Sequence, residues 1–223
     1  MAIMGVFDVI GPIMVGPSSS HTAGAARLAK MAREIAGNDI KEVEFLLHGS
    51  FGKTYKGHGT DRALVAGILG MKPCDDKLRI SMDIAKEKGI NIIFKEQDLG
   101  GEAHPNTVKF IIKSSKGKEN IIVGSSIGGG NIEITEINGC KVKLTGAYDT
   151  IITLHKDIPG TVAKVSAILY ENQINIAFMN LERSQRGKGA TMSFEVDSTV
   201  NEELLTSIEQ IEGIEKVIII KKV

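Results

Sequence analysis

The sequence has few cysteines, few aromatic residues and no net charge. Cys74 and Cys140 are its only cysteines among 223 residues, which excludes a disulfide scaffold and a four-thiolate metal site made by this chain alone. Lys plus Arg and Asp plus Glu number 27 each, so the usual electrostatic attraction to nucleic acids or anionic membranes is missing. Aromatic residues make up 4% and Trp is absent, which disfavours base-stacking platforms. A small polar ligand suits this composition better.

Long apolar runs and a basic leader segment are also missing. The first 16 residues are largely apolar but include Asp8 and lack the positive charges of a secretory signal. No run reaches the ~20 apolar residues that a transmembrane helix needs. We therefore expect a cytoplasmic protein with reduced cysteines. Its 42% hydrophobic and 24% charged residues are typical of a folded globular chain.

The C-terminal third has the clearest pattern of secondary structure. Hydrophobic residues alternate in four short runs, which predict strands, and recur at helical spacing in two others. The resulting order, βαββαβ, is that of the ferredoxin-like split motif. The predicted strands contain residues 152–154, 174–178, 192–196 and 217–220, the helices contain residues 162–169 and 204–211, and a glycine-bearing turn is predicted at 186–189.

The first 148 residues predict an α+β unit with its helices early and its strands late. We therefore place the domain boundary between residues 148 and 149, with domains 1–148 and 149–223. Asn138-Gly139 is typical of a hairpin turn between strands 132–137 and 140–144. Helices are predicted around 28–35, 64–68 and 76–88, further strands at 43–47, 90–94, 108–112 and 121–123, and a glycine-rich loop at 48–59.

The segment from Gly16 to Gly24 combines four hydroxyl groups and an imidazole at the expected start of a helix. Unpaired backbone N–H groups and the helix dipole favour an anion there, so the segment indicates a site for a carboxylate or a phosphate. The alternative is that one serine caps the helix and the others are solvated. His21 can serve as an acid or a base because the ordinary histidine pKa is ~6.5.

A second histidine, His58, lies between Gly57 and Gly59, again just before a predicted helix. The flanking glycines either let a ligand approach the backbone or only permit a sharp turn. Residues 49–54 and 57–63 each come close to a nucleotide-binding signature. We reject both, because the first has too few residues between its glycines and the second does not directly follow a strand.

Gly128, Gly129 and Gly130 follow a short apolar strand and two serines, Ser125 and Ser126. Successive glycines weaken a strand, so they indicate a backbone nest for a ligand or, equally well, a β-bulge or wide connection. Farther along, Asp157-Ile158-Pro159-Gly160 leaves free N–H groups before a helix, where an amino acid could dock, and we expect Asn175 to reach the same end of the sheet. The remaining histidines, His48, His104 and His155, have no comparable polar surroundings and are interpreted as structural or surface residues.

These segments resemble two known families. The C-terminal unit, with Asp157-x-Pro159-Gly160 after its first strand and Gln173-Ile174-Asn175-Ile176 opening the second, is similar to ACT domains, regulatory modules that often bind amino acids between paired copies. The N-terminal segments 16–24, 56–61 and 125–130, in this order, resemble the β chain of the iron–sulfur-dependent bacterial L-serine dehydratase. The resemblance covers essentially the whole chain.

That family converts L-serine to pyruvate and ammonia without pyridoxal phosphate. It uses a [4Fe–4S] cluster whose cysteines lie in an α chain or α domain, and iron acts as a Lewis acid on the serine hydroxyl while a base removes the Cα proton. The resemblance therefore implies a lyase subunit of amino-acid metabolism and gluconeogenesis with an α-chain partner. It also implies that the partner, and not this chain, holds the cluster.

The resemblance also implies roles for individual residues. His21 and His58 become the acid–base candidates, without an indication of which one is the base. The ACT resemblance implies self-association and L-serine as the effector, and no metal ligand is expected in this chain. The implied substrate-binding residues are Ser18, Ser19, Ser20, Thr22, Ser125, Ser126, Gly128, Gly129 and Gly130, and the implied effector-binding residues are Asp157, Gly160, Asn175 and Ile176.

Two alternatives stay open at this point. The chain is either an enzyme subunit or a stand-alone amino-acid-sensing protein without catalytic activity. The N-terminal unit also resembles a module of phosphoglycerate dehydrogenases that binds substrate or effector anions, which leaves a purely regulatory role for that unit open.

Overall fold

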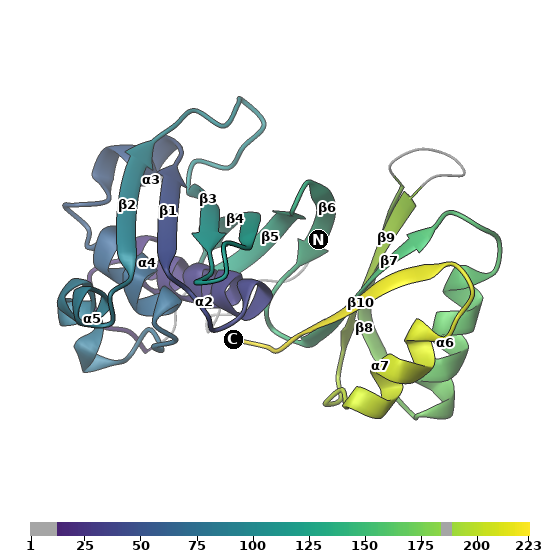
Figure 1. The fold of residues 1–223 in the computed structure, drawn as a ribbon. Helices are drawn as coiled ribbons and strands as arrows, with labels where there is room; N and C mark the ends of the chain where they lie inside the picture. Colours follow the sequence, from purple (N-terminus) through teal and green to yellow (C-terminus); the bar gives the residue numbers. More distant parts are fainter. Residues whose placement is uncertain (1–12, 184–188) are drawn as a thin grey trace. The chain divides into compact units, whose positions relative to one another are not determined.

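The computed structural model describes residues 13–183 and 189–223, and the chain divides into two compact units (Figure 1). Unit 1 extends to Gly139, and unit 2 runs from Cys140 to Lys222. Each unit contains a β-sheet and helices, which confirms the predicted α+β class. The segment from Cys140 to Tyr148 groups with unit 2, and the proposed boundary between residues 148 and 149 stays a prediction.

Unit 1 contributes the strands β2-β1-β3-β4-β5, in this order, to a six-stranded sheet whose last strand is β6. Among these five strands only the β1–β2 pair is parallel. β1 buries Val43, Phe45 and Leu47, as the predicted alternation requires. The elements are η1 (Ser19–Gly24), α2 (Ala25–Ala36), β1 (Glu42–Leu47), α3 (Gly49–Thr54), α4 (Thr60–Ile68), η2 (Asp76–Ile80), α5 (Ser81–Glu87), β2 (Asn91–Glu96), β3 (Thr107–Lys113), β4 (Glu119–Gly128) and β5 (Asn131–Ile137).

Helices α2 and α4 pack directly on each other. A Cβ at Gly67 in α4 would lie 2.2 Å from the backbone oxygen of Ala26 in α2, so the two backbones approach closely only because Gly67 has no side chain. Leu28 and Met31 in α2 and Leu64 in α4 are fully buried. Their helical spacing, visible in the sequence, therefore marks the core face.

Three predictions for unit 1 need correction. The predicted loop 48–59 contains the helix α3, and the predicted helix 76–88 is split into the 3-10 turn η2 and the helix α5. β4 extends to Gly128, well beyond the predicted end at Val123, so Ser125 and Ser126 belong to a strand and not to a loop. The hairpin turn at Asn138 and Gly139 is confirmed by their positive φ angles of 50° and 81°.

Unit 2 contains the predicted ferredoxin-like motif. β7 (Asp149–Lys156), α6 (Thr161–Glu171), β8 (Ile176–Arg183), β9 (Gly189–Val196), α7 (Glu202–Glu209) and β10 (Ile214–Ile220) follow in the order βαββαβ, preceded by β6 (Cys140–Leu144). The sheet order is β10-β7-β9-β8, with β8 and β10 at its edges. Of the turn predicted at 186–189, residues 186–188 lie outside the described residues.

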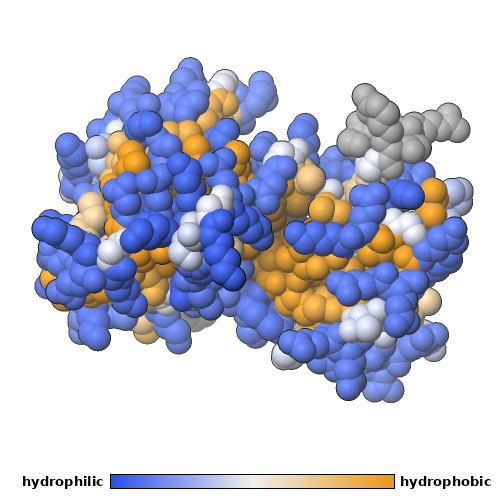
Figure 2. Space-filling model, in the orientation of Figure 1, coloured by the Kyte–Doolittle hydropathy of each residue, from blue (hydrophilic) through white to orange (hydrophobic). Residues whose placement is uncertain are grey.

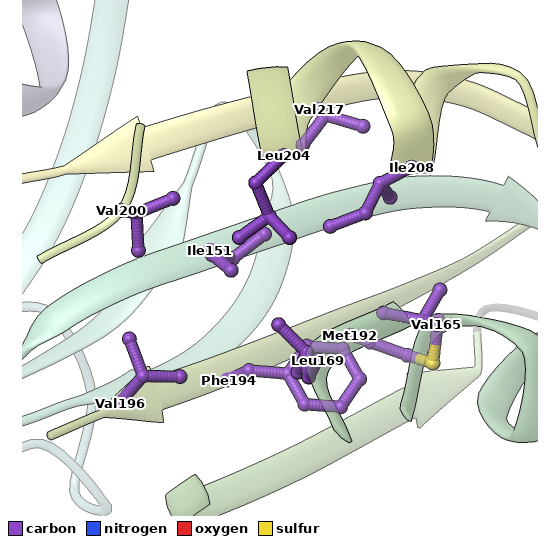
Figure 3. Packing of buried hydrophobic residues seen from close by; sticks show 10 residues of the cluster. All are labelled: Ile151, Val165, Leu169, Met192, Phe194, Val196, Val200, Leu204, Ile208 and Val217. Carbon is purple, nitrogen blue, oxygen red and sulfur yellow. The ribbon is translucent and has the colours of Figure 1, made fainter. Parts of the chain in front are cut away.

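The core of unit 2 lies between this sheet and its two helices (Figure 3). Met192, Phe194 and Val196 lie at alternate positions of β9 and point toward the two helices. They face Val165 and Leu169 of α6 and Leu204 and Ile208 of α7. Ser193 and Glu195, at the positions between them, therefore lie on the opposite face of the sheet. Within the described ranges, no helix of either unit has the length and apolar character needed to cross a membrane.

Candidate functional site

The serine-rich segment forms the first turn of a continuous helical segment made of η1 and α2. Ser18 caps it, since its Oγ accepts a hydrogen bond of 3.1 Å from the backbone N–H of His21. Thr22 is buried and its hydroxyl donates to the backbone oxygen of His58 at 3.5 Å. One serine thus acts as the cap considered in the sequence, while Ser19 and Ser20 lie partly exposed in the same turn.

His21 and His58 lie side by side although they are 37 positions apart in the chain. Their ring centroids are 5.0 Å apart with an interplanar angle of 52°. The edge of the His21 ring also contacts Phe51, with 5.2 Å between centroids, whereas His58 is exposed. The two predicted acid–base candidates are therefore brought together, one packed against the protein and one open to solvent.

Ser50 is part of this cluster, and the sequence reasoning missed it. Its Oγ lies 3.1 Å from Nε2 of His21. Ser50 is held by α3, whose start rests on the segment before β3, because the N–H of Ser50 donates to the backbone oxygen of Pro105 at 2.8 Å. The only signal for Ser50 in the sequence is its place between two glycines in the segment that precedes His58.

The surroundings of His21 favour its neutral form. Burial lowers the pKa of His21 below its usual value, and the nearby positive charge of protonated His58 lowers this pKa further. A neutral imidazole can accept a proton, which is the first requirement of a general base. His21 therefore combines a fixed orientation with a protonation state suited to proton abstraction near neutral pH.

The two serines of β4 bond inside the protein. Ser126 is fully buried and its Oγ donates to the backbone oxygen of Ser20 at 3.0 Å. Ser125 shares a 2.7 Å hydrogen bond with the hydroxyl of Thr107. Ser126 thus connects β4 to η1 and helps to shape the serine-rich turn, and its role in substrate binding stays a prediction.

The glycines after β4 form a bulge and a tight turn. Gly128, Gly129 and Gly130 have φ angles of 105°, 61° and 82°, and the β4–β5 register shifts between Ser126 and Gly128. This agrees with the β-bulge considered in the sequence. Arg27, a second residue that the sequence reasoning missed, donates from Nη1 to the backbone oxygen of Gly130 at 2.9 Å, so the turn also lies against the start of α2.

Comparisons with known proteins identify the family of this chain. Residues 5–136 match the family model described as serine dehydratase beta chain, and residues 150–213 match the ACT domain. The chain belongs to the serine dehydratase beta chain family. It is 45% identical to the "L-serine dehydratase, beta chain" of Peptoniphilus asaccharolyticus over 92% of this chain and 93% of that protein. It is also 42% identical to the "Probable L-serine dehydratase, beta chain" of Bacillus subtilis, over 96% of each.

A more distant similarity connects this family member to another enzyme. The chain is 29% identical to the D-3-phosphoglycerate dehydrogenase of Methanocaldococcus jannaschii over 88% of this chain, but this match covers only 37% of that protein. The shared part spans both units. The comparison therefore identifies a related two-unit segment that is combined there with further sequence.

The other three histidines lie outside the His21–His58 cluster. Nδ1 of His48 accepts from the backbone N–H of Leu99, and Nδ1 of His104 accepts from that of Asn106, both at 3.1 Å. His155 is buried, and burial lowers its pKa from the usual value. These contacts agree with the interpretation of all three as structural or surface residues.

The expected effector residues lie at opposite ends of the sheet in unit 2. Asp157 follows the end of β7 and is bound by Arg183, with 3.0 Å from Nη2 to Oδ1 and from Nε to Oδ2. Asn175 precedes β8 and donates to Asp197 at 2.6 Å. β7 and β8 both pair antiparallel with β9 and are therefore parallel to each other. The expectation that Asn175 reaches the same end as Asp157 is thus wrong for a single chain.

Two further effector candidates have clear structural roles. Gly160 caps α6 with φ 91°, a conformation that favours glycine. Ile176 packs against the core cluster of unit 2. Gly160 therefore determines the shape of the loop before α6, and the side chain of Ile176 contributes to the core.

The cysteines of this family member do not fit a four-thiolate cluster. Cys74 is exposed and Cys140 is partly buried, and two thiols are half the number that such a cluster needs. Among the described residues, no group of three or more His, Cys, Asp or Glu side chains is arranged to hold a metal ion.

Proposed function

We propose that this chain is the β subunit of an L-serine dehydratase, which deaminates L-serine to pyruvate and ammonia together with an α chain. The observation that carries the proposal is the His21–His58 pair beside the serine-rich turn, in a chain of the serine dehydratase beta chain family. Two adjacent imidazoles, one with a pKa lowered by burial and by its neighbour, are suited to moving protons on a small substrate.

The residues of unit 1 suggest how protons move in this reaction. The reaction removes the Cα proton and the β-hydroxyl group of serine as water, and the resulting aminoacrylate takes up water and releases ammonia to give pyruvate. Neutral His21, oriented by Ser50, is suited to accept the Cα proton, and exposed His58 is suited to exchange protons with solvent. The partly exposed hydroxyls of Ser19 and Ser20 and the N–H groups of the turn are suited to the substrate carboxylate.

The proposal assigns the iron–sulfur cluster to the α chain. Two cysteines cannot hold a [4Fe–4S] cluster, so we expect the purified β chain to be colourless and to bind no iron stoichiometrically. A brown preparation with four irons per chain would contradict this assignment. Pyridoxal phosphate is not part of the proposal.

Reconstitution with the α chain tests the proposed activity. We expect pyruvate from L-serine only when both chains are mixed anaerobically, and neither chain alone should be active. A mixture with His21→Asn, which keeps a polar side chain of similar size, serves as the matched control and should form the complex with little turnover. Complex formation without turnover by the wild-type mixture, combined with serine binding to this chain, would instead favour the amino-acid-sensing alternative.

We further propose that unit 2 self-associates through the edge strand β8. Phe178, Met179 and Leu181 expose 57%, 44% and 45% of their surface on this strand, and apolar surface gathers over the sheet of unit 2 in Figure 2. A free edge that carries exposed apolar side chains is suited to pairing with another strand. A second copy of this chain would complete the sheet symmetrically.

Such pairing would resolve the separation of the effector residues. Two copies of β8 related by a twofold axis run antiparallel, so the start of one lies beside the end of the other. Asn175 of one chain then approaches the Asp157–Arg183 pair of the second chain. The proposed effector site, for L-serine, is therefore formed only between paired chains.

A positive charge introduced on the edge strand β8 tests the proposed pairing of two chains. Leu181→Lys on the exposed edge should convert the dimer to a monomer in analytical ultracentrifugation and abolish L-serine binding at the effector site. Leu205→Lys, on the partly buried side of α7, serves as a control for general loss of stability. A wild-type chain that is monomeric at all concentrations would contradict self-association through β8.

A further inference from the structure

Thr22 is a buried residue between the two segments that carry the histidine pair. It follows His21 directly in η1, and only 1% of its surface is exposed. Its hydroxyl donates to the backbone oxygen of His58 at 3.5 Å. Thr22 therefore connects the segment of one histidine with the segment of the other.

The side chain of Thr22 is confined by the segment before η1. A Cβ at Gly16, which has φ 133°, would lie 2.5 Å from Cγ2 and 2.7 Å from Oγ1 of Thr22, so this side chain packs directly on the backbone of Gly16. Threonine is also β-branched, which restricts its rotamers. The hydroxyl of Thr22 is therefore held in one direction, toward the carbonyl of His58.

The backbone around His58 has the conformational freedom of its two glycine neighbours. Gly57 precedes His58, and Gly59 follows it with φ 67°, while a Cβ added at Gly59 would meet nothing within 4 Å. The N–H of His58 donates to the backbone oxygen of Thr54 at 3.2 Å. The peptide groups of this exposed histidine are thus held from two sides, its N–H by Thr54 and its C=O by Thr22.

We propose that Thr22 is a positioning residue that keeps the two imidazoles close enough to pass a proton between them. Their ring centroids are 5.0 Å apart, and rotation of the His58 peptide would carry its ring away from His21. The inference rests on the proposed function, because proton transfer gives this spacing its purpose. It assigns to Thr22 a role different from the substrate contact that the family resemblance implies.

The pKa of His21 reports the position of His58, and its measurement needs no α chain. After burial, the charge of His58 is the next cause that lowers this pKa. Thr22→Val keeps the shape of the side chain and removes its hydroxyl, so NMR titration of the full 223-residue chain should give a higher His21 pKa than in the wild type. Thr22→Ser, which keeps the hydroxyl, should give the wild-type pKa.

Thr60→Val is the matched control. Thr60 is also fully buried and begins α4, two residues after His58, but its hydroxyl has no hydrogen-bond partner among the described residues. The same substitution there should leave the His21 pKa unchanged. When Thr22→Val is combined with His58→Asn, the His21 pKa should equal that of His58→Asn alone, because Thr22 acts through His58. Thr22→Ala also removes the hydroxyl and covers the case in which Thr22→Val does not fold.

Turnover tests the purpose of the spacing. In the enzyme reconstituted with the α chain, Thr22→Val should lower kcat about three- to ten-fold with little change in KM, the size expected for one hydrogen bond, and Thr22→Ser should recover it. A wild-type His21 pKa in Thr22→Val, an equal rise in Thr22→Ser, or a raised pKa with normal kcat would overturn the proposal. A wild-type mixture without turnover would instead contradict the proposed function, and the titration would still decide whether Thr22 holds His58.

Discussion

Oγ of Ser50 lies 3.1 Å from Nε2 of His21, although the two residues come from different elements and are 29 positions apart. A hydroxyl can donate to a neutral imidazole nitrogen or accept from its N–H, so the contact orients the ring in either tautomer. The edge of the His21 ring also lies against Phe51, the next residue of the same helix. The short helix α3 therefore determines the orientation of the His21 ring.

Loss of this contact should affect turnover more than substrate binding. We predict that Ser50→Ala lowers kcat of the reconstituted enzyme roughly ten-fold with little change in KM, because misorientation of a general base affects the transition state most. Ser50→Thr, which keeps the hydroxyl, should recover most of the activity. Ser114→Ala, in the exposed turn before β4, serves as the control. If Ser50→Ala has normal kcat, Ser50 is not a positioning residue.

Both histidines should be needed for turnover in the assembled enzyme. We predict that His21→Ala and His58→Ala each lower kcat roughly 10²-fold or more, the scale of general acid–base catalysis. The double variant should lose much less than the product of the two single losses, because the two imidazoles act as one unit. Steady-state kinetics of the three variants measures this. A histidine whose replacement leaves kcat unchanged would be assigned to the scaffold.

The pKa of His21 is the basis of a third prediction. Burial and then the charge of His58 lower it below the ordinary value of ~6.5, and His58→Asn removes the second cause. NMR titration of the ring protons should therefore give a His21 pKa below 6.5 in the wild type and a higher one in His58→Asn. The opposite order would show that His58 does not act on His21 electrostatically.

The same shift affects stability in a definite direction. The folded chain binds the proton of His21 more weakly than the unfolded chain does. The contribution of neutral His21 to the free energy of unfolding is therefore complete above the pKa that His21 has in the unfolded chain. It is lost as the pH falls through ~6.5 toward the lower folded pKa. Denaturant midpoints of the wild type should therefore fall more steeply below pH 6.5 than those of His21→Asn, and parallel curves would contradict this.

The parts of the fold that were predictable depend on local periodicity. The strands and helices of unit 2 follow from alternating and helical runs such as Met192–Val196, because one face of each element is buried in the same core. The helix α3 was not predictable. Its glycine-rich sequence has little helical preference, and it forms against the backbone of Pro105, a contact with a distant part of the chain.

In the candidate site, too, some features follow from the local sequence and others depend on contacts between distant parts of the chain. His21, His58 and the serines were visible as unusual polar residues beside expected helix starts. The contact of Ser50 with His21 and the separation of Asn175 from Asp157 depend on tertiary pairing, since they follow from the placement of α3 and from the parallel course of β7 and β8. A single sequence contains no local signal for either relationship.

The last prediction concerns the contact that holds the serine-rich turn against the sheet. Gly24 has helical angles, φ −62° and ψ −42°, so Ala should by helix preference alone stabilise the chain by about 1 kcal/mol. However, a Cβ at Gly24 would lie 2.0 Å from Oγ and 2.9 Å from Cβ of Ser126, which is fully buried. Overpacking of this kind typically costs about 1–3 kcal/mol, so the clash should outweigh the helix preference.

We therefore expect Gly24→Ala to lower the free energy of unfolding, measured by urea denaturation. Gly101→Ala is the matched control, since an added Cβ there meets nothing within 4 Å and should change stability by less than about 0.5 kcal/mol. Ser126→Gly should remove the clash, so the double variant should be more stable than the two single losses predict. Additive losses, or a Gly24→Ala chain as stable as the wild type, would contradict the prediction. Either result would show that η1 and β4 leave room for a Cβ at Gly24 beside the Ser126 side chain.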